Sequence, residues 1–165
     1  MRLAILVACV AGAACTASPA DVMGTYSGPL TRGDNGCNVA DWVPGSQIDD
    51  VTFDITQSGS SVTVTTNGSE AAIQNSLVMG HTFTGDVTDS AINVLIVGTT
   101  MRTLNTCHFR LDAAITAAVS GSTLSGELHY RETVLDPSCL YVTDAGVITQ
   151  NPTGCDSVST FDDSR

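Results

Sequence analysis

The sequence predicts an all-β domain, an up-and-down antiparallel β-barrel of about eight strands, with a β-sandwich as the alternative. Three observations carry this prediction. Val, Ile, Thr and Ser are abundant, and 15 glycines in 165 residues supply turn positions. Apolar and polar residues alternate with period two in several segments. Short turn signals separate these segments, and no strong helix signal is present, so the length favours one domain built from consecutive hairpins.

The segment before the barrel is typical of an export signal. Arg2 is followed by an unbroken apolar run of twelve residues, Leu3 to Ala14. A membrane-spanning helix needs about 20 apolar residues, so the run fits the core of a signal peptide covering residues 1–14. Residues 15–21 are then a short tether before a single domain at 22–165. Ordinary secretory cleavage after Ala20 is the alternative.

Small residues at Gly12 and Ala14 directly before Cys15 resemble the signal of bacterial lipoproteins, although Gly12 stands where that family usually has Leu. The resemblance implies that Cys15 becomes the first residue of the mature chain and carries the lipid, palmitate included. Thr16 replaces the Asp that retains such proteins at the inner membrane, which implies an outer-membrane anchor.

The barrel elements follow in order along the chain. A first strand is expected at 22–30, then a long loop at 31–47 that holds Cys37 and the single tryptophan, Trp42. Clean alternation predicts a hairpin of strands 50–57 and 61–66, and the Asn67-Gly68 turn leads to further strands near 71–79, 81–88 and 91–97.

The last hairpin has the clearest pattern. Strands 107–117 and 123–131 flank a turn at Ser120-Gly121. This turn would pair Ala113 with Leu128, and a register two residues away also brings the apolar faces together, so both stay open. Glycines inside two strands, Gly85 and Gly126, predict a bend or a close backbone approach.

The start Gly24-Thr25-Tyr26, opening a series of hairpins, resembles the Gly-x-Trp start of lipocalin-like and avidin-like barrels, with Tyr in place of Trp. In lipocalins an arginine of the last barrel strand packs on that ring, and Arg131 is the candidate here. By analogy alone, the resemblance implies a carrier of a small apolar ligand.

Four cysteines remain in the exported domain after Cys9 leaves with the signal peptide and Cys15 takes the lipid: Cys37, Cys107, Cys139 and Cys155. They predict two disulfides. Local pairing of Cys139 with Cys155, and of Cys37 with Cys107, is the favoured of three connectivities. A zinc site is disfavoured because no two cysteines have the Cys-x-x-Cys spacing.

Composition excludes several activities. All six cationic residues are arginines, and the absence of lysine excludes phosphate loops and Schiff-base catalysis. The formal charge of −11 disfavours nucleic-acid binding. His129 and Asp112 on the last hairpin are the one pair suited to acid–base chemistry, and ordinary cross-strand pairing is the preferred interpretation.

The sequence therefore predicts a non-enzymatic extracytoplasmic lipoprotein, without cofactor or metal, with a binding or envelope-structural role. The alternatives are a small apolar ligand carrier and, less favoured, a hydrolase using His129 and Asp112. After loss of Arg2 the chain has five arginines against 17 acids, a net charge of −12. Attraction to anionic lipid is then unavailable, so we expect membrane attachment through acyl chains at Cys15, and the sequence names no protein partner.

Overall fold

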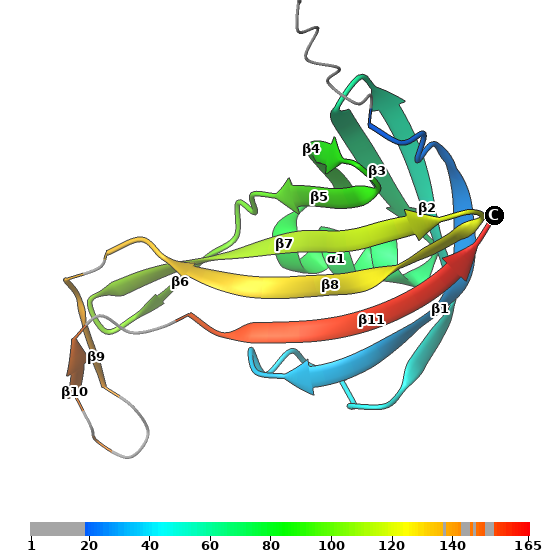
Figure 1. Ribbon diagram of the computed structural model, residues 1–165. Coiled ribbons are helices and arrows are strands. Elements are labelled where there is room, and N and C mark those ends of the chain that lie inside the picture. Colours follow the sequence, from blue (N-terminus) through cyan, green and yellow to red (C-terminus); the bar gives the residue numbers. More distant parts are fainter. Residues whose placement is uncertain (1–18, 137, 143–145, 147, 151–153) are drawn as a thin grey trace, which may run out of the picture.

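Eight strands close into an antiparallel barrel in the computed structural model, which describes residues 19–136, 138–142, 146, 148–150 and 154–165 (Figure 1). The barrel strands, in order around the ring, are β1 (Gly24–Asn35), β2 (Gln47–Ser58), β3 (Ser61–Asn67), β4 (Thr82–Thr88), β5 (Ala91–Ile96), β7 (Cys107–Ser120), β8 (Thr123–Val134) and β11 (Asp156–Ser164). Pairing of β5 with β7 and of β11 with β1 closes the ring. The predicted up-and-down barrel is confirmed.

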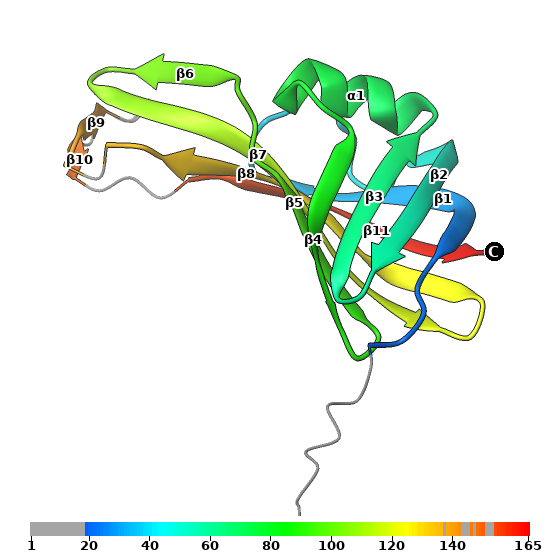
Figure 2. The same ribbon diagram turned by 90° about the horizontal axis from the view of Figure 1, so that it is seen from above.

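An arm projects from one side of the barrel (Figures 1 and 2). It consists of the extra strand β6 (Met101–Leu104) on β7, the adjoining parts of β7 and β8, and a two-stranded sheet of β9 (Leu140–Val142) and β10 (Ile148–Gln150). The arm has a small apolar cluster of its own, formed by Cys107, Phe109 and Cys139 with Leu104 and Val134.

Helix α1 (Ser69–Val78) replaces the strand expected near 71–79, so that prediction is wrong. The segment contains good helix formers, and the backbone NH and the hydroxyl of Ser69 both donate to the Asp50 carboxylate at its start. Gly68, with φ 79°, turns the chain out of β3, and a Cβ there would lie 1.7 Å from the carbonyl oxygen of Asp50. The Asn67-Gly68 turn therefore begins a helix that covers one end of the barrel (Figure 2).

Large side chains fill the barrel interior. Tyr26, Phe53, Phe83 and Tyr130 are fully buried there, together with Val, Ile and Leu side chains from every barrel strand except β11, which contributes Phe161. The alternation predicted for 50–57 is confirmed, because Val51, Phe53 and Ile55 are the buried residues of β2. The core thus occupies the space in which a barrel carrier would hold its ligand.

The two strand glycines lie where neighbouring backbones come closest. A Cβ on Gly85 would lie 2.1 Å from the carbonyl oxygen of Asn93, and one on Gly126 would lie 2.3 Å from that of Thr116. The expected close approach is confirmed at both positions. Between β7 and β8 the observed register is the second of the two left open, with Ala113 opposite Tyr130 and a turn at Gly121-Ser122.

The disulfides join Cys37 to Cys155 and Cys107 to Cys139, so the favoured pairing was wrong. Cys37 and Cys155 meet because barrel closure places β1 beside β11, far away in sequence. Cys107, at the start of β7, lies beside the chain that leaves β8. Two disulfides are typical of an oxidising, extracytoplasmic compartment. Among the described residues, no helix has the length and apolarity to cross a bilayer.

Candidate functional site

The structure tests only some of the predicted site features. The signal peptide and Cys15 lie outside the described residues. The arginine over the Tyr26 ring is Arg165, at 5.5 Å from the ring centroid, and not Arg131. Arg131 instead points to the outer surface, where its Nε donates to Asp156 at 3.0 Å. The sequence around Arg131 did not show that another barrel strand, β11, follows. That strand brings Arg165 to the Tyr26 ring.

His129 and Asp112 are both on the outer face of the last hairpin but engage different partners. Burial alone would raise the pKa of Asp112, but hydrogen bonds from Arg110, Thr133 and the Gly98 NH outweigh it, and the pKa is lowered. These donors lie 2.7–2.9 Å away. The carboxylate is therefore held in a structural network.

His129 lies between two other carboxylates. Its Nδ1 is 3.1 Å from Asp156 and its Nε2 is 3.0 Å from Glu127, while only 7% of the residue is exposed. Asp112 lies opposite Arg131 in the β7–β8 ladder, and Ala114 lies opposite His129. Ion pairs within β8 and between β8 and β11 therefore engage His129, and no hydrogen bond joins His129 to Asp112 among the described residues.

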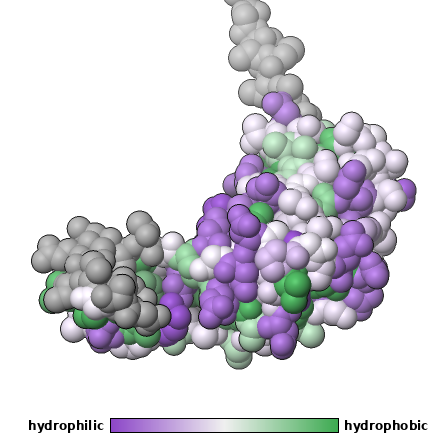
Figure 3. Space-filling view, turned by 90° about the horizontal axis from the view of Figure 1, so that it is seen from below, coloured by the Kyte–Doolittle hydropathy of each residue, from purple (hydrophilic) through white to green (hydrophobic). Residues whose placement is uncertain are grey.

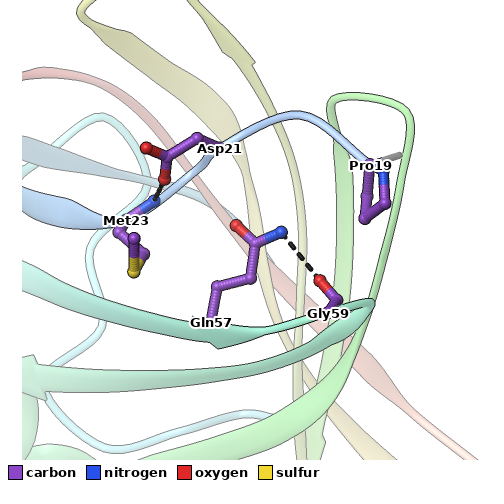
Figure 4. Close-up of a pocket in the computed structure, with 5 residues that line it drawn as sticks. All are labelled: Pro19, Asp21, Met23, Gln57 and Gly59. Carbon is purple, nitrogen blue, oxygen red and sulfur yellow. Dashed lines mark hydrogen bonds between the residues drawn. The ribbon is translucent and has the colours of Figure 1, made fainter. Parts of the chain in front are cut away.

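A shallow pocket of about 310 Å³ lies at the end of the barrel where the described chain begins (Figure 4). It is lined by Pro19, Asp21, Met23, Gln57 and Gly59. Gln57 receives the Val22 NH and donates to the carbonyl oxygens of Ala20 and Gly59. The Gln57 side chain therefore holds the segment before β1 against the β2–β3 turn. We interpret the pocket as the junction between that segment and the barrel.

Two adjoining pockets of about 270 and 350 Å³ form a groove at the opposite, helix-covered end. We call this the helix-end groove. Val39 and Ala40, from the loop between β1 and β2, and Ser76 and Leu77, from α1, line both pockets. Ile73 adds to the apolar wall of the larger pocket, and Phe109 and Leu111 to that of the smaller one. The volumes lie near the lower end of the range for small-molecule sites.

Two arginines lie in this groove although the protein is strongly acidic. Arg32 lies over the Trp42 ring at 5.1 Å and donates to the Asp41 carbonyl oxygen at 2.5 Å. Within the described part of the chain, its buried Nε has no hydrogen-bond partner. Arg102 pairs with Glu132 at 2.6 Å beside the Phe109 ring. The groove therefore combines apolar and polar wall residues with two guanidinium groups, of which that of Arg102 is paired with Glu132.

A buried polar cluster lies on the other side of α1, inside the barrel. It consists of Glu70 and Gln74, one helical turn apart, and Tyr130 of β8. The Tyr130 hydroxyl donates to one oxygen of the Glu70 carboxyl group. Among the described residues, the other Glu70 oxygen, both amide atoms of Gln74 and the hydroxyls of Thr66 and Ser159 lack partners. Each such group costs about 1–3 kcal/mol.

Burial controls the proton affinity of this cluster. It raises the pKa of Glu70 to about 7, against the opposing effects of the Tyr130 hydrogen bond and the Arg32 charge. It also raises the pKa of Tyr130 well above the usual value, with Glu70 adding to the effect. At the far end of the barrel, burial and the nearby Asp162 raise the pKa of Asp163 to about 6. Glu70 thus changes charge near neutral pH.

The sequence did not point to Glu70, Gln74 or Arg32. The strand expected near 71–79 would have placed alternate residues inward, whereas only the helical spacing of four puts Glu70 and Gln74 on one face. Arg32 falls in the segment 31–47, which was expected to be a loop. A helical interpretation of 69–78 was the one signal that could have found the cluster.

The face in Figure 3 is covered mainly by hydrophilic and neutral side chains, with scattered hydrophobic ones. In the described part of the chain, no group of three or more His, Cys, Asp or Glu side chains is arranged to hold a metal ion. Comparisons with family models, with curated proteins and with solved structures find no match to this chain.

Proposed function

We propose that this protein is a non-catalytic, lipid-anchored binding protein of the cell envelope that takes a small amphipathic molecule in the helix-end groove. The ligand has an apolar body and an acidic or other hydrogen-bond-accepting group. The observation that carries the proposal is the Arg32 guanidinium in the wall of the larger pocket, where apolar side chains lie beside the polar Asp41 and Ser76. Walls of Val39, Ile73 and Leu77 suit the body of such a ligand.

The lipocalin-like resemblance would favour the barrel interior as the ligand site. The groove is the better candidate. The interior is occupied by fully buried aromatic and aliphatic side chains. The groove, in contrast, is an open space bounded by a loop, a helix and the base of the arm.

The position of the groove also suits an anchored protein. The segment before β1 lies at the end of the barrel that contains the β2–β3 and β4–β5 turns, where the Ala20 NH donates to the Asp89 carbonyl oxygen. Helix α1 covers the opposite end (Figure 2). An anchor at Cys15 would therefore leave the groove directed away from the membrane and open to ligand.

Anilinonaphthalene sulfonate tests the groove, because it joins an apolar body to an anionic group and its fluorescence rises in apolar surroundings. We expect saturable binding by the protein at pH 6. Ser76 is exposed and lines both pockets, so Ser76→Phe should fill the groove and abolish binding with little loss of stability. Asn75→Phe is the matched control, because Asn75 is exposed on the same helix and lines neither pocket.

A second loss of dye binding is expected for Arg32→Gln, which keeps a polar side chain and removes the guanidinium charge. Equal dye binding by wild type, Ser76→Phe and Asn75→Phe would place the dye elsewhere and refute the groove as its site. The anchor has a separate test in mass spectrometry of the mature N-terminus. We expect an acylated Cys15, and an unmodified chain that begins at Asp21 would contradict the anchor.

A further inference from the structure

Helix α1 forms a wall of two different compartments. Ile73, Ser76 and Leu77 face the helix-end groove, whereas Glu70 and Gln74 point into the barrel. The three buried residues of the helix are Glu70, Gln74 and Val78, so two of the three are polar. A helix that packs on a barrel mainly through apolar side chains would be held by their burial. In this helix Val78 is part of the barrel core and Ile73 and Leu77 pack against it, whereas Glu70 is buried on the inner face through the hydrogen bond from Tyr130.

The chain changes direction at both ends of α1. Gly68 before the helix and Met79 after it both have left-handed backbone conformations, with φ values of 79° and 61°. The chain therefore turns sharply at both ends, and the helix continues neither β3 nor β4. Ser69 is tied to Asp50, whereas Met79 at the other end is 69% exposed.

We propose that α1 is a lid whose closure depends on the protonated form of Glu70, so that the helix loosens and the groove loses its wall when this carboxyl group ionises. The inference rests on the proposed function for its consequence, which is release of the groove ligand as pH rises. In the closed lid, the protonated carboxyl group accepts from Tyr130 without placing a charge in the barrel. The ionised group would leave a carboxylate oxygen buried and unpartnered, and loosening of α1 gives it access to water.

The other titratable and charged groups around Glu70 do not account for the proposed pH dependence of the lid. Tyr130 of β8 has a pKa raised well above its usual value and stays protonated at neutral pH. The charge of Arg32 of β1 eases ionisation, yet burial still raises the pKa of Glu70 to about 7. On the β2 side, Asp50 is bound to Ser69, and His81, before β4, is bound through Nδ1 to the Thr66 carbonyl oxygen. On β3 and β11, the buried hydroxyls of Thr66 and Ser159 are uncharged.

Amide hydrogen exchange of residues 69–78 tests the lid without any ligand. If Glu70 has its usual pKa of 4.5 in the open form and a pKa of about 7 in the closed form, the opening constant rises about tenfold between pH 6 and pH 8. Protection of the α1 amides, corrected for intrinsic exchange, should fall by that factor in wild type and stay constant in Glu70→Gln. Asp163→Asn is the matched control and should keep the tenfold change, because Asp163 lies at the other end of the barrel.

Two further measurements complete the test. Trp42, the single tryptophan, lies 6.0 Å from the Tyr130 ring, so its fluorescence should follow the same pH transition. Titration of the Glu70 side-chain carboxyl carbon by NMR in the wild type gives its ionisation directly, even if Glu70→Gln fails to fold. A constant α1 protection between pH 6 and pH 8 while Glu70 ionises would overturn the lid.

Dye binding separates the lid from the proposed function. With both correct, affinity for anilinonaphthalene sulfonate falls between pH 6 and pH 8 in wild type and not in Glu70→Gln. Binding at pH 6 with pH-independent protection would refute the lid and leave the groove. A pH-dependent lid in a protein that binds no dye in the groove would refute the proposed function and leave the lid.

Discussion

Glu70 predicts a pH dependence of global stability that can be calculated from its burial. The group is 1% exposed, and its pKa rises from 4.5 to about 7 on folding. The folded state therefore holds this proton more tightly than the unfolded chain does. Deprotonation opposes folding, so this contribution is largest below pH 4.5 and is lost as pH rises through about 7.

The expected loss follows from the linkage relation. Between pH 5 and pH 8, the free energy of unfolding falls by about 2.5 kcal/mol because of Glu70. Asp163 is also 1% exposed, and its pKa rises from 3.8 to about 6, which adds a loss of about 1.4 kcal/mol over the same interval. The wild type should thus lose about 4 kcal/mol through these two groups together.

Urea unfolding with the disulfides intact, at pH 5 and at pH 8, measures the difference. Glu70→Gln should reduce the loss to about 1.4 kcal/mol, and Asp163→Asn should reduce it to about 2.5 kcal/mol. At pH 8 the Glu70→Gln variant should be more stable than wild type although a carboxyl group has been removed. An equal dependence on pH in wild type and Glu70→Gln would refute the reasoning, because it would mean that Glu70 is not buried in the folded protein.

Three other predictions test the fold. Gly126→Ala should cost about 1–3 kcal/mol, because its Cβ would meet the Thr116 backbone, whereas Gly121→Asn in the open β7–β8 turn should cost little; thermal unfolding compares the two. Replacing Cys107 and Cys139 together by Ser should leave the far-UV circular dichroism of the barrel intact and make the arm sensitive to limited proteolysis; an arm that resists cleavage equally in both proteins would contradict this. Asp112→Asn removes a group whose lowered pKa stabilises the fold above about pH 4 and loses that effect as pH falls. The variant should be less stable than wild type at pH 7, and the gap should narrow on acidification, as measured by denaturant unfolding.

The strands of the barrel could be predicted because each one carries its own signal. In β2, alternation of Val51, Phe53 and Ile55 with polar residues identifies the buried face without reference to any other segment. Gly85 and Gly126 likewise mark close backbone approaches from their position inside strands. Local pattern therefore sufficed for the fold class.

Helix α1 could not be predicted in this way, because its inward face carries Glu70 and Gln74 where an amphipathic helix would carry apolar residues. The candidate site was missed for the same reason. The disulfides depend on which strands become neighbours when the barrel closes. Cys37 meets Cys155 across the β1–β11 seam, a contact that separation along the chain argues against.

That seam also determines how the barrel would carry mechanical load. Tension between the proposed anchor and the helix-end groove would run along β1, parallel to its length. The hydrogen bonds to β2 and β11 would then be loaded side by side in shear, where many must break at once, and not one after another. The Cys37–Cys155 bond ties the far end of this seam covalently, so β1 cannot slide out past β11. A barrel of modest size can in this way resist being pulled from its own attachment point.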